Sequence, residues 1–284
     1  MSLTTLKAGS FTIRGRSLGG FYTGLHIPEL NALLDVGTAL RTGAGSRNLF
    51  LSHAHADHVG SLPGLLGMRG LVGVPHTLRV FMPRETVEGV TKALEHLSLV
   101  HRWSLAIDVV PMEPGQVERV KGDLYVRAIK TLHPVPSLGY VFFRKIKKLR
   151  EEFKSLPGSE IGRLRHSGAD IFDELERLEF GYATDTLPEV LANNPELFKV
   201  KTLILECTFL DDRKSVKAAR AGCHIHLDEL LPLMDQFENE RVVLMHFSQI
   251  YSPNDVRAIF EKRCPEHQRE RFKLFVPDGE EWWD

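Results

Sequence analysis

The chain has 284 residues, 43% hydrophobic and 26% charged, so it can bury a sizeable core and is not a disordered or low-complexity protein. No apolar run approaches the ~20 residues that cross a bilayer, so no transmembrane helix is predicted. The net charge of −1 excludes a protein that binds nucleic acid through overall basicity, although local patches can still bind it.

Short apolar runs recur along the chain and are typical of β-strands, because they are rich in Val, Ile, Leu, Phe and Tyr. In chain order they are Asn31–Val36, Asn48–Ser52, Leu124–Leu132, Ser137–Phe143, Phe180–Thr184, Lys201–Leu205 and Arg241–Met245. Between them, helices are predicted over Arg84–Leu97, over Glu229–Phe237 with Asp228 as N-cap, and over Val256–Arg263 with Ser252 or Asn254 as N-cap. This order predicts an α/β protein, a mixed sheet with helices on both faces.

The predicted strands share a feature at their ends. Five of them lead directly to His, Asp or Glu, namely His53 and His55, His133, Asp185, Glu206 and His246. Side chains that gather at one edge of a sheet form a site there. We therefore expect these residues to meet.

The cysteines indicate the compartment. Cys207, Cys223 and Cys264 are scattered and odd in number, which fits reduced thiols better than a disulfide framework. The N-terminus has no basic segment followed by an apolar one, so we expect no secretory signal. Both observations favour a cytoplasmic protein.

The strongest motif is LSHAHADHVG at positions 51–60, with four residues of metal-ligand type within six positions. Imidazole suits zinc, and carboxylate suits zinc or manganese. Alternation in an extended segment places His53 and His55 on the same side, while Asp57 and His58 fall in the following turn. One segment can therefore begin two adjacent metal sites.

This His-x-His-x-Asp-His motif resembles that of the metallo-β-lactamase superfamily, whose later motifs are matched by TLH at 131–133, ATDT at 183–186 and LMHFS at 244–248. The resemblance implies an αββα sandwich of two mixed sheets with helices on both outer faces. It also implies that one ion is held by His53, His55 and His133, a second by Asp57, His58 and His246, and that Asp185 bridges the two.

Within the superfamily the chain is most similar to ribonuclease Z, the tRNA 3′-end endonuclease, in its short plant and eukaryotic form. The resemblance covers about Ser10 to Phe275 and includes HVGSLPG at 58–64, SLGY at 137–140, ECTFLDD at 206–212 and HIH at 224–226. It implies a metal-dependent endoribonuclease that removes the 3′ trailer from precursor tRNA with two divalent ions, most simply Zn²⁺ with Mn²⁺ as the alternative. It also implies a possible homodimer.

Three residues are expected to act in catalysis by the same resemblance. Asp57 would orient the attacking water, and a histidine after the ECTF stretch would assist together with Glu206. We expect that histidine to be His226, because Asp228 resembles the helix cap that follows it in the family; His224 remains the alternative. Glu206 could instead only orient a ligand.

The segment at about 144–179 lies where the family carries a substrate arm within an otherwise single domain. It is predicted as a basic, helical insertion, with Arg144, Lys145, Lys147, Lys148 and Arg150 as candidate substrate contacts. Lys and Arg contacts to phosphate would make RNA binding sensitive to salt. A solvated charged surface is the alternative interpretation.

The chain also departs from the ribonuclease Z pattern. SLGGFY at 17–22 replaces the Pro-x-Lys-x-Arg-Asn loop, PGSEIG at 157–162 replaces the Gly-Pro signature of the arm, Thr184 replaces a glycine, and SQIY at 248–251 lacks the family's arginine. Two other functions therefore stay open. One is a hydrolase of the same fold acting on a small phosphodiester or thioester, and the other is an RNA-binding scaffold with an inactive site.

Overall fold

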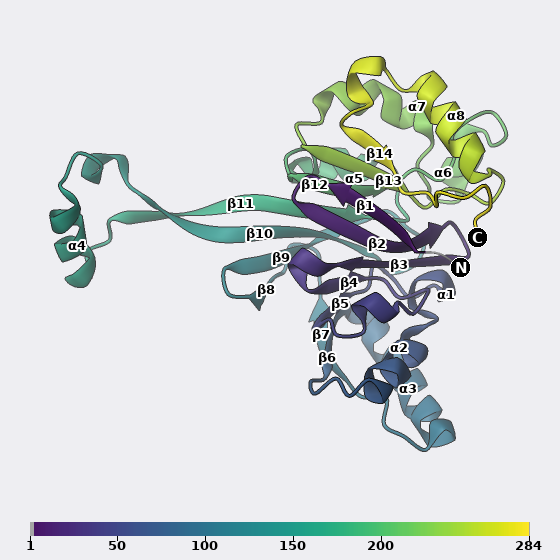
Figure 1. Ribbon diagram of the computed structural model, residues 1–284, viewed down its shortest axis with the longest axis horizontal. Helices are drawn as coiled ribbons and strands as arrows, with labels where there is room; N and C mark the ends of the chain where they lie inside the picture. The colour runs from purple at the N-terminus through teal and green to yellow at the C-terminus, as the bar shows by residue number, and fades with distance from the viewer. Residues whose placement is uncertain (1–2, 284) are drawn as a thin grey trace.

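Two seven-stranded β-sheets pack face to face, with helices over both outer faces, in the computed structural model (Figure 1). The structure describes residues 3–283. The first sheet has the order β1-β2-β3-β4-β5-β6-β7, and the second has the order β14-β13-β12-β11-β10-β9-β8. Each sheet is half antiparallel and half parallel. The expected αββα sandwich of two mixed sheets is confirmed.

The strands of the first sheet are β1 Thr4–Ala8, β2 Phe11–Leu18, β3 Tyr22–Ile27, β4 Ala32–Leu34, β5 Asn48–Phe50, β6 Leu78–Pro83 and β7 Ile107–Met112. Those of the second are β8 Val117–Lys121, β9 Leu124–Lys130, β10 Leu138–Leu149, β11 Phe172–Ala183, β12 Thr202–Glu206, β13 Arg241–Met245 and β14 Phe272–Leu274. The α-helices are α1 Ala56–Val59, α2 Leu62–Leu71, α3 Val87–His101, α4 Gly158–His166, α5 Glu189–Asn193, α6 Val216–Ala221, α7 Leu227–Leu230 and α8 Pro253–Arg263. The 3₁₀ helices are η1 Pro28–Leu30, η2 Arg41–Gly43, η3 Arg84–Thr86, η4 Glu151–Phe153, η5 Pro195–Phe198, η6 Leu231–Gln236 and η7 Glu266–Gln268.

The central strands are apolar on both faces because both faces are covered. On β12, Leu203 and Leu205 pack toward the helices while Ile204 packs between the sheets. On β5, Leu49 packs toward α2 and α3 while Phe50 lies between the sheets. Alternation of this kind follows from the two-residue period of a strand. The chain thus forms three apolar layers.

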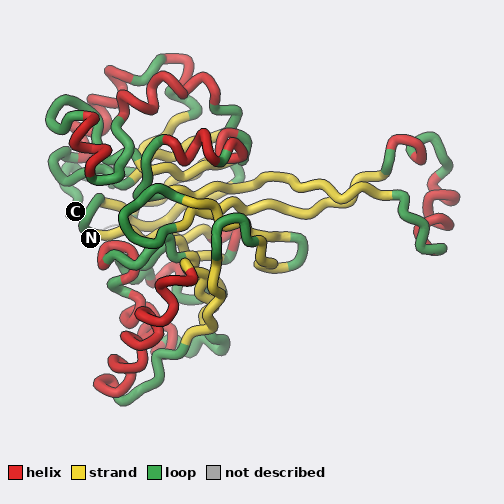
Figure 2. Tube along the Cα trace, turned by 180° about the vertical axis from the view of Figure 1, so that it is seen from behind, coloured by secondary structure: helices red, strands yellow, loops and turns green. Residues whose placement is uncertain are grey.

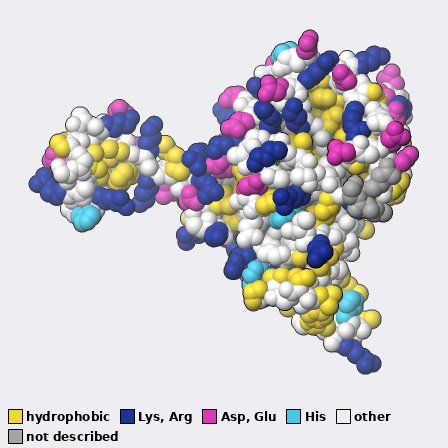
Figure 3. Space-filling view, viewed as in Figure 1, with side chains coloured by type: hydrophobic (Ala, Val, Ile, Leu, Met, Phe, Trp, Pro, Cys, Tyr) yellow, Lys and Arg dark blue, Asp and Glu magenta, His cyan; other side chains and the backbone are white. Residues whose placement is uncertain are grey.

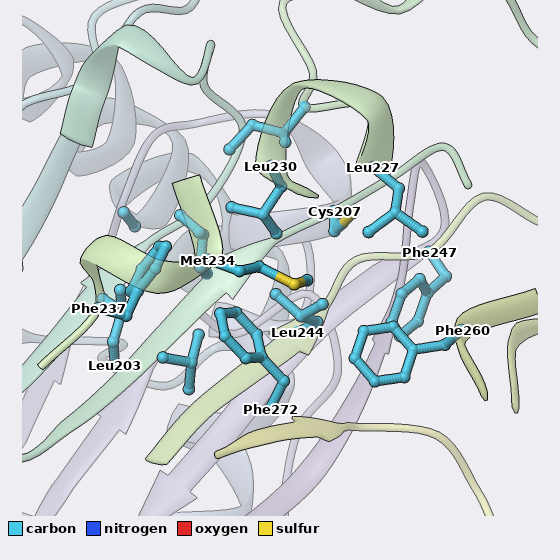
Figure 4. Packing of buried hydrophobic residues seen from close by; sticks show 14 of the residues in the cluster. Leu203, Cys207, Leu227, Leu230, Met234, Phe237, Leu244, Phe247, Phe260 and Phe272 are labelled. Carbon is cyan, nitrogen blue, oxygen red and sulfur yellow. The ribbon is translucent and has the colours of Figure 1, made fainter. Parts of the chain in front are cut away.

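The layer between the second sheet and its helices is drawn in Figure 4. Leu227 and Leu230 of α7, Met234 of η6 and Phe260 of α8 point toward Leu244 of β13. This packing fixes the strand ends that lead into the candidate site.

The segment at 144–179 is a long arm that projects from the second sheet (Figures 1 and 2). Its stem is a continuation of β10 and β11, paired from Arg144↔Arg177 to Leu149↔Phe172, and its tip carries η4 and α4. The prediction of a helical insertion is therefore wrong for the stem and right only for the tip. Three cross-strand pairs of opposite charge, Lys145↔Glu176, Lys147↔Glu174 and Lys148↔Asp173, stabilise this ribbon.

The predicted strands are all present, with ends shifted by a few residues apart from the long extensions of β10 and β11. The helix predicted over Glu229–Phe237 is instead the short α7 followed by η6, and its N-cap is His226 in place of Asp228. Helix α8 begins after Ser252, which forms a capping box with Asp255. No helix in residues 3–283 combines the length and apolar character needed to cross a membrane.

Candidate metal centre

Seven histidines and aspartates meet at one edge of the two sheets. His53 and His55 follow β5, Asp57 and His58 lie in α1, His133 follows β9, Asp185 follows β11 and His246 follows β13. Because β11 runs from the arm to Asp185, the ligands lie at the opposite end of this strand from the arm. The structure thus brings together all seven residues that the sequence analysis assigned to metal binding.

The first ligand group contains His53, His55, His133 and Asp185. Nε2 of His53 and Nε2 of His133 lie 3.0 Å and 3.2 Å from Nδ1 of His55. Nitrogens bound tetrahedrally to one zinc at ~2.0–2.1 Å would be ~3.3 Å apart, so the spacing fits a metal ion. Oδ2 of Asp185 lies 3.6 Å from Nε2 of His53 and completes a fourfold set.

The second ligand group contains Asp57, His58, Asp185 and His246. Nε2 of His58 lies 3.4 Å from a carboxylate oxygen of Asp57 and 3.4 Å from Oδ1 of Asp185. Nε2 of His58 and Nε2 of His246 are buried and have no hydrogen-bond partner among the described residues. Buried nitrogens of this kind are costly unless something satisfies them, and a divalent ion would do so. Asp185 belongs to both groups and offers one oxygen to each.

Burial sets the protonation of His53 and His133, whereas at His58 burial is outweighed by Asp185 and Asp35, which raise the pKa of this ring. Burial lowers the pKa of His53 to about 2 and that of His133 to about 4, so both rings are neutral at physiological pH. Burial acts to raise the pKa of Asp57, but the rings of His246 and His58, whose Nε2 atoms lie 3.9 Å and 3.4 Å from its Oδ2, outweigh burial and hold this pKa below its usual value. Neutral imidazoles and ionised carboxylates are the forms that bind metal.

Asp35 binds Nδ1 of His58, the nitrogen that does not face the ligand group, and so orients this ring. It was not predicted to belong to the site. Its carboxylate accepts hydrogen bonds from Nδ1 of His58 at 2.8 Å, from the hydroxyl of Tyr182 at 2.6 Å, and from both N and Oγ of Ser52 at 2.7 Å. A carboxylate on the far nitrogen of a ligand histidine fixes the ring and strengthens its lone pair. The signal in the sequence was an aspartate closing the apolar run Asn31–Val36.

Several residues around the ligands have backbone conformations that residues other than glycine rarely adopt. Asp35, Asp185 and His246 have φ values of 54°, 47° and 62°, in the left-handed region. Such conformations cost of order 1–3 kcal/mol and persist at functional sites, where the surrounding structure imposes them. At Gly37, a Cβ atom would lie 1.7 Å from the carbonyl oxygen of Asp57, so only glycine lets the ligand loop approach this closely.

Glu206 is fully buried beside the second ligand group. Its carboxylate accepts hydrogen bonds from the backbone N of Thr186 at 2.6 Å and from the hydroxyl of Thr208 at 2.6 Å. The Thr208 oxygen in turn lies 3.1 Å from Nδ1 of His246 and can accept a hydrogen bond from this nitrogen. Glu206 therefore orients a ligand histidine through Thr208.

His224, and not His226, lies against Glu206 at the mouth of the site. Nδ1 of His224 is 3.2 Å from Oε1 of Glu206, and its ring lies 5.4 Å from that of His246. Burial lowers the pKa of His224, but Glu206 outweighs it and raises the pKa to about 9.

His226 points away from the ligands and serves the backbone. Its Nδ1 accepts a hydrogen bond from the backbone N of Asp228 at 3.1 Å, and its Nε2 donates to the carbonyl of Asp211 at 3.2 Å. The ring is 1% exposed. Asp228 was predicted as the helix cap, whereas His226 is the cap and His224 is the histidine that lies beside Glu206.

The five candidate contacts on the arm differ in their surroundings. Arg144 pairs with Asp123, Lys145 with Glu174, and Arg150 with Asp170 and Asp173. Lys147 and Lys148 are exposed, and no described carboxylate pairs with them. Residues 144–179 hold nine Lys and Arg against eight Asp and Glu, so the expected basic insertion is nearly neutral. Strand β11 supplies the acidic residues that face the lysines of β10.

An open cleft of about 460 Å³ adjoins the first ligand group. It is lined by His133 itself, by Lys130, and by the loops that hold Arg84 and Glu113. Its volume is within the range of sites that hold a nucleotide-sized ligand. The cleft gives a ligand an open route to His133 of the first ligand group.

No family model matches the chain. Two proteins named tRNase Z from Arabidopsis thaliana are similar to it. One is 35% identical over 88% of this chain and 90% of its own length. The other, named as chloroplastic, is 32% identical over 87% of this chain and 70% of its own length. A protein named nuclear ribonuclease Z from Triticum aestivum is 36% identical over 58% of this chain and 94% of its own length.

Solved structures share the fold at lower sequence identity. The metallo-β-lactamase fold protein YhfI from Bacillus subtilis has a TM-score of 0.60 at 15% identity, covering 96% of this chain and 95% of its own. The short form of human tRNase Z has a TM-score of 0.56 at 16% identity, covering 99% of this chain and 97% of its own.

Proposed function

This chain belongs to the ribonuclease Z family, and we propose that its two ligand groups hold two divalent ions, most simply zinc, for cutting the 3′ trailer from precursor tRNA. It is a metal-dependent hydrolase of the endoribonuclease type. The observation that carries the two-ion proposal is Asp185, whose two oxygens serve the two groups. We treat the whole chain as one metallo-β-lactamase-fold domain with an arm.

The residues of the two ligand groups would each act on a different part of the reaction at the scissile phosphodiester. Divalent ions bound in such a pair of sites lower the pKa of a water and offset the charge that develops on phosphoryl oxygens. We propose that Asp57, in the second group, accepts a hydrogen bond from the attacking water and aligns it with phosphorus. Asp35 and Thr208 hold the His58 and His246 rings in position.

His224 is proposed as the general acid. Its Nδ1 faces Glu206, which leaves Nε2 to donate a proton to the leaving 3′ oxygen. When water attacks phosphorus and the P–O3′ bond breaks, that proton gives a tRNA with a 3′-hydroxyl, while the trailer keeps the 5′-phosphate. His226 has both nitrogens engaged by backbone groups and has none left for this step.

The arm is proposed to hold the tRNA away from the chemistry. Lys147, Lys148 and Arg165 are exposed and have no described ion-pair partner, and Lys147 and Arg165 line one hollow under the tip. Basic side chains surround the stem and tip of the arm (Figure 3). Contacts of these side chains with phosphate would position the duplex without reading its sequence.

A homodimer is proposed to form through an apolar patch on the ends of α2 and α3. Leu71, Val72, Leu99, Val100 and Trp103 are 47–85% exposed there, and hydrophobic side chains gather over these helices at the lower end of the molecule in Figure 3. An apolar patch is complementary to itself, as a twofold interface requires. Light scattering on the wild type and on Leu99→Glu would compare the masses, and a monomeric wild type would refute the dimer.

The cytoplasm is proposed as the compartment, because Cys207 and Cys264 are buried free thiols and Cys223 is a free thiol as well. One relative is named as chloroplastic and another as nuclear, so imaging of a fluorescent fusion is the test. Accumulation in an organelle would refute this proposal.

Cleavage of an end-labelled precursor tRNA with a 3′ trailer, with zinc or manganese added, tests the function directly. We expect one cut at the 3′ end of the mature tRNA, lost on Asp57→Ala. If precursor tRNA stays intact while bis(p-nitrophenyl) phosphate is hydrolysed, the protein acts on a small diester instead.

A further inference from the structure

We propose that Phe21 and Trp283 form an aromatic platform that stacks a single-stranded base next to the scissile phosphate. Both side chains are 44% exposed, although large aromatic side chains usually bury their rings. Their ring centroids lie 5.5 Å apart in an edge-to-face arrangement, which leaves part of each ring open to solvent. The proposal rests on the proposed function and names the part of the substrate that this surface binds.

The platform is attached to the metal centre through the turn between β2 and β3. Gly19 in this turn donates a backbone hydrogen bond to the carbonyl of Phe247 at 2.9 Å and forms a bridge with Ser248. A Cβ atom on Gly19 would lie 3.3 Å from the ring of His246, so the turn lies directly on a ligand. Phe21 follows two residues later, within ~7 Å of chain. The platform therefore begins two residues from a backbone position that contacts a candidate ligand, His246.

The second ring is held in place by its neighbour. Trp282 is buried and donates from Nε1 to the carbonyl of Tyr251 at 2.6 Å, while its own carbonyl accepts from the hydroxyl of Tyr22 at 3.0 Å. Trp283 is thus fixed against the turn and lies 6.4 Å from the Tyr22 ring. A rigid aromatic surface loses little entropy when a base stacks on it.

The chemistry of the two rings favours a base over a phosphate as the contact. Every base offers a π-face, so stacking tolerates any sequence, whereas hydrogen-bond readout does not. This suits an enzyme whose substrates share a shape and differ in the bases near the cut. The platform also occupies the place where the family's Pro-x-Lys-x-Arg-Asn loop is missing from this chain.

The test compares two substrates across variants that keep or remove the rings. Phe21→Leu and Trp283→Leu retain apolar bulk without a π-face, whereas Phe21→Tyr and Trp283→Phe retain it. We expect each Leu variant to lower kcat/KM for precursor tRNA about 5- to 100-fold relative to its rate on bis(p-nitrophenyl) phosphate. The ring-keeping variants should stay near wild type. Val117→Ala on β8, another exposed apolar position, is the matched control.

Two results would overturn the platform. One is precursor tRNA cleavage by the Leu variants at the wild-type rate, and the other is an equal loss on both substrates with a lowered melting temperature, which would mean a purely structural contact. If the wild type itself fails to cut precursor tRNA, the proposed function falls. Binding then decides the platform: fluorescence of 2-aminopurine in single-stranded RNA should be quenched by the wild type and not by the Leu variants.

Discussion

Separate substitution of the two histidines in the HIH stretch, His224 and His226, distinguishes a catalytic residue from a structural one. The His224 side chain is 19% exposed and lies against the buried carboxylate of Glu206, so His224→Ala also costs some stability, and the rate is measured on the folded fraction. Loss of a general acid typically costs 10²–10⁴-fold in rate, which corresponds to ~3–5 kcal/mol in the activation free energy. We expect this loss in single-turnover cleavage of precursor tRNA by the folded protein.

His226→Ala should have the opposite effects. It removes the cap on the backbone N of Asp228, worth ~1 kcal/mol, and leaves the carbonyl of Asp211 without its donor, at ~1–3 kcal/mol. Together these lower the free energy of unfolding by ~2–4 kcal/mol, and so the melting temperature by several degrees. The cleavage rate of the folded fraction should stay within a few-fold of wild type.

A leaving-group comparison sharpens the assay. The nitrophenolate of bis(p-nitrophenyl) phosphate leaves without a proton, so His224→Ala should lose far less on this diester than on RNA. Metal content, measured alongside, should be unchanged in both variants. The reasoning is refuted if His226→Ala loses a hundredfold in rate at an unchanged melting temperature while His224→Ala stays active. Metal loss in His224→Ala would instead make this residue a ligand.

Three further predictions concern the metal, its support and the arm. Asp35→Asn should weaken metal binding 10–100-fold, as measured by titration with zinc; equal affinity would mean that Asp35 does not orient His58. A chelator should abolish cleavage and lower the melting temperature. Zinc in large excess over its Kd should restore ~4 kcal/mol of the free energy of unfolding. A melting temperature that does not depend on zinc would argue against a bound ion. Lys147→Glu together with Lys148→Glu should raise KM for precursor tRNA and reduce the salt dependence of binding by about two phosphate contacts, and Lys145→Ala, already paired with Glu174, should change both less. An unaltered salt dependence would show that the exposed lysines do not touch RNA.

The clustering of the candidate metal ligands could be predicted because their chemistry is local to the sequence. His53, His55, Asp57 and His58 lie within six positions, and the remaining ligands each end an apolar run. Strand ends converge at one edge of a sheet, so order along the chain was enough to place them together. Asp35 also follows directly after an apolar strand, Ala32–Leu34, but its role depends on Tyr182, which is 147 positions away.

The arm could not be read correctly because its charges are balanced across a strand pair. Lys145, Lys147 and Lys148 form a basic run in the sequence, yet Glu176, Glu174 and Asp173 face them in the ribbon. Register between two distant strands decides this, and no local pattern reports it. The sequence did not show which of His224 and His226 lies beside Glu206, because which of the two rings caps the helix depends on backbone angles.

Gly37 has a consequence for reading related chains. The carbonyl of Asp57 occupies the space where a side chain at position 37 would begin, so any larger residue must displace the loop that carries two ligands. A protein with all seven ligands but an alanine at this position would have an intact motif and a misplaced centre. In a survey of sequences, this single glycine would therefore separate active enzymes from degenerate copies that a motif search counts as equal.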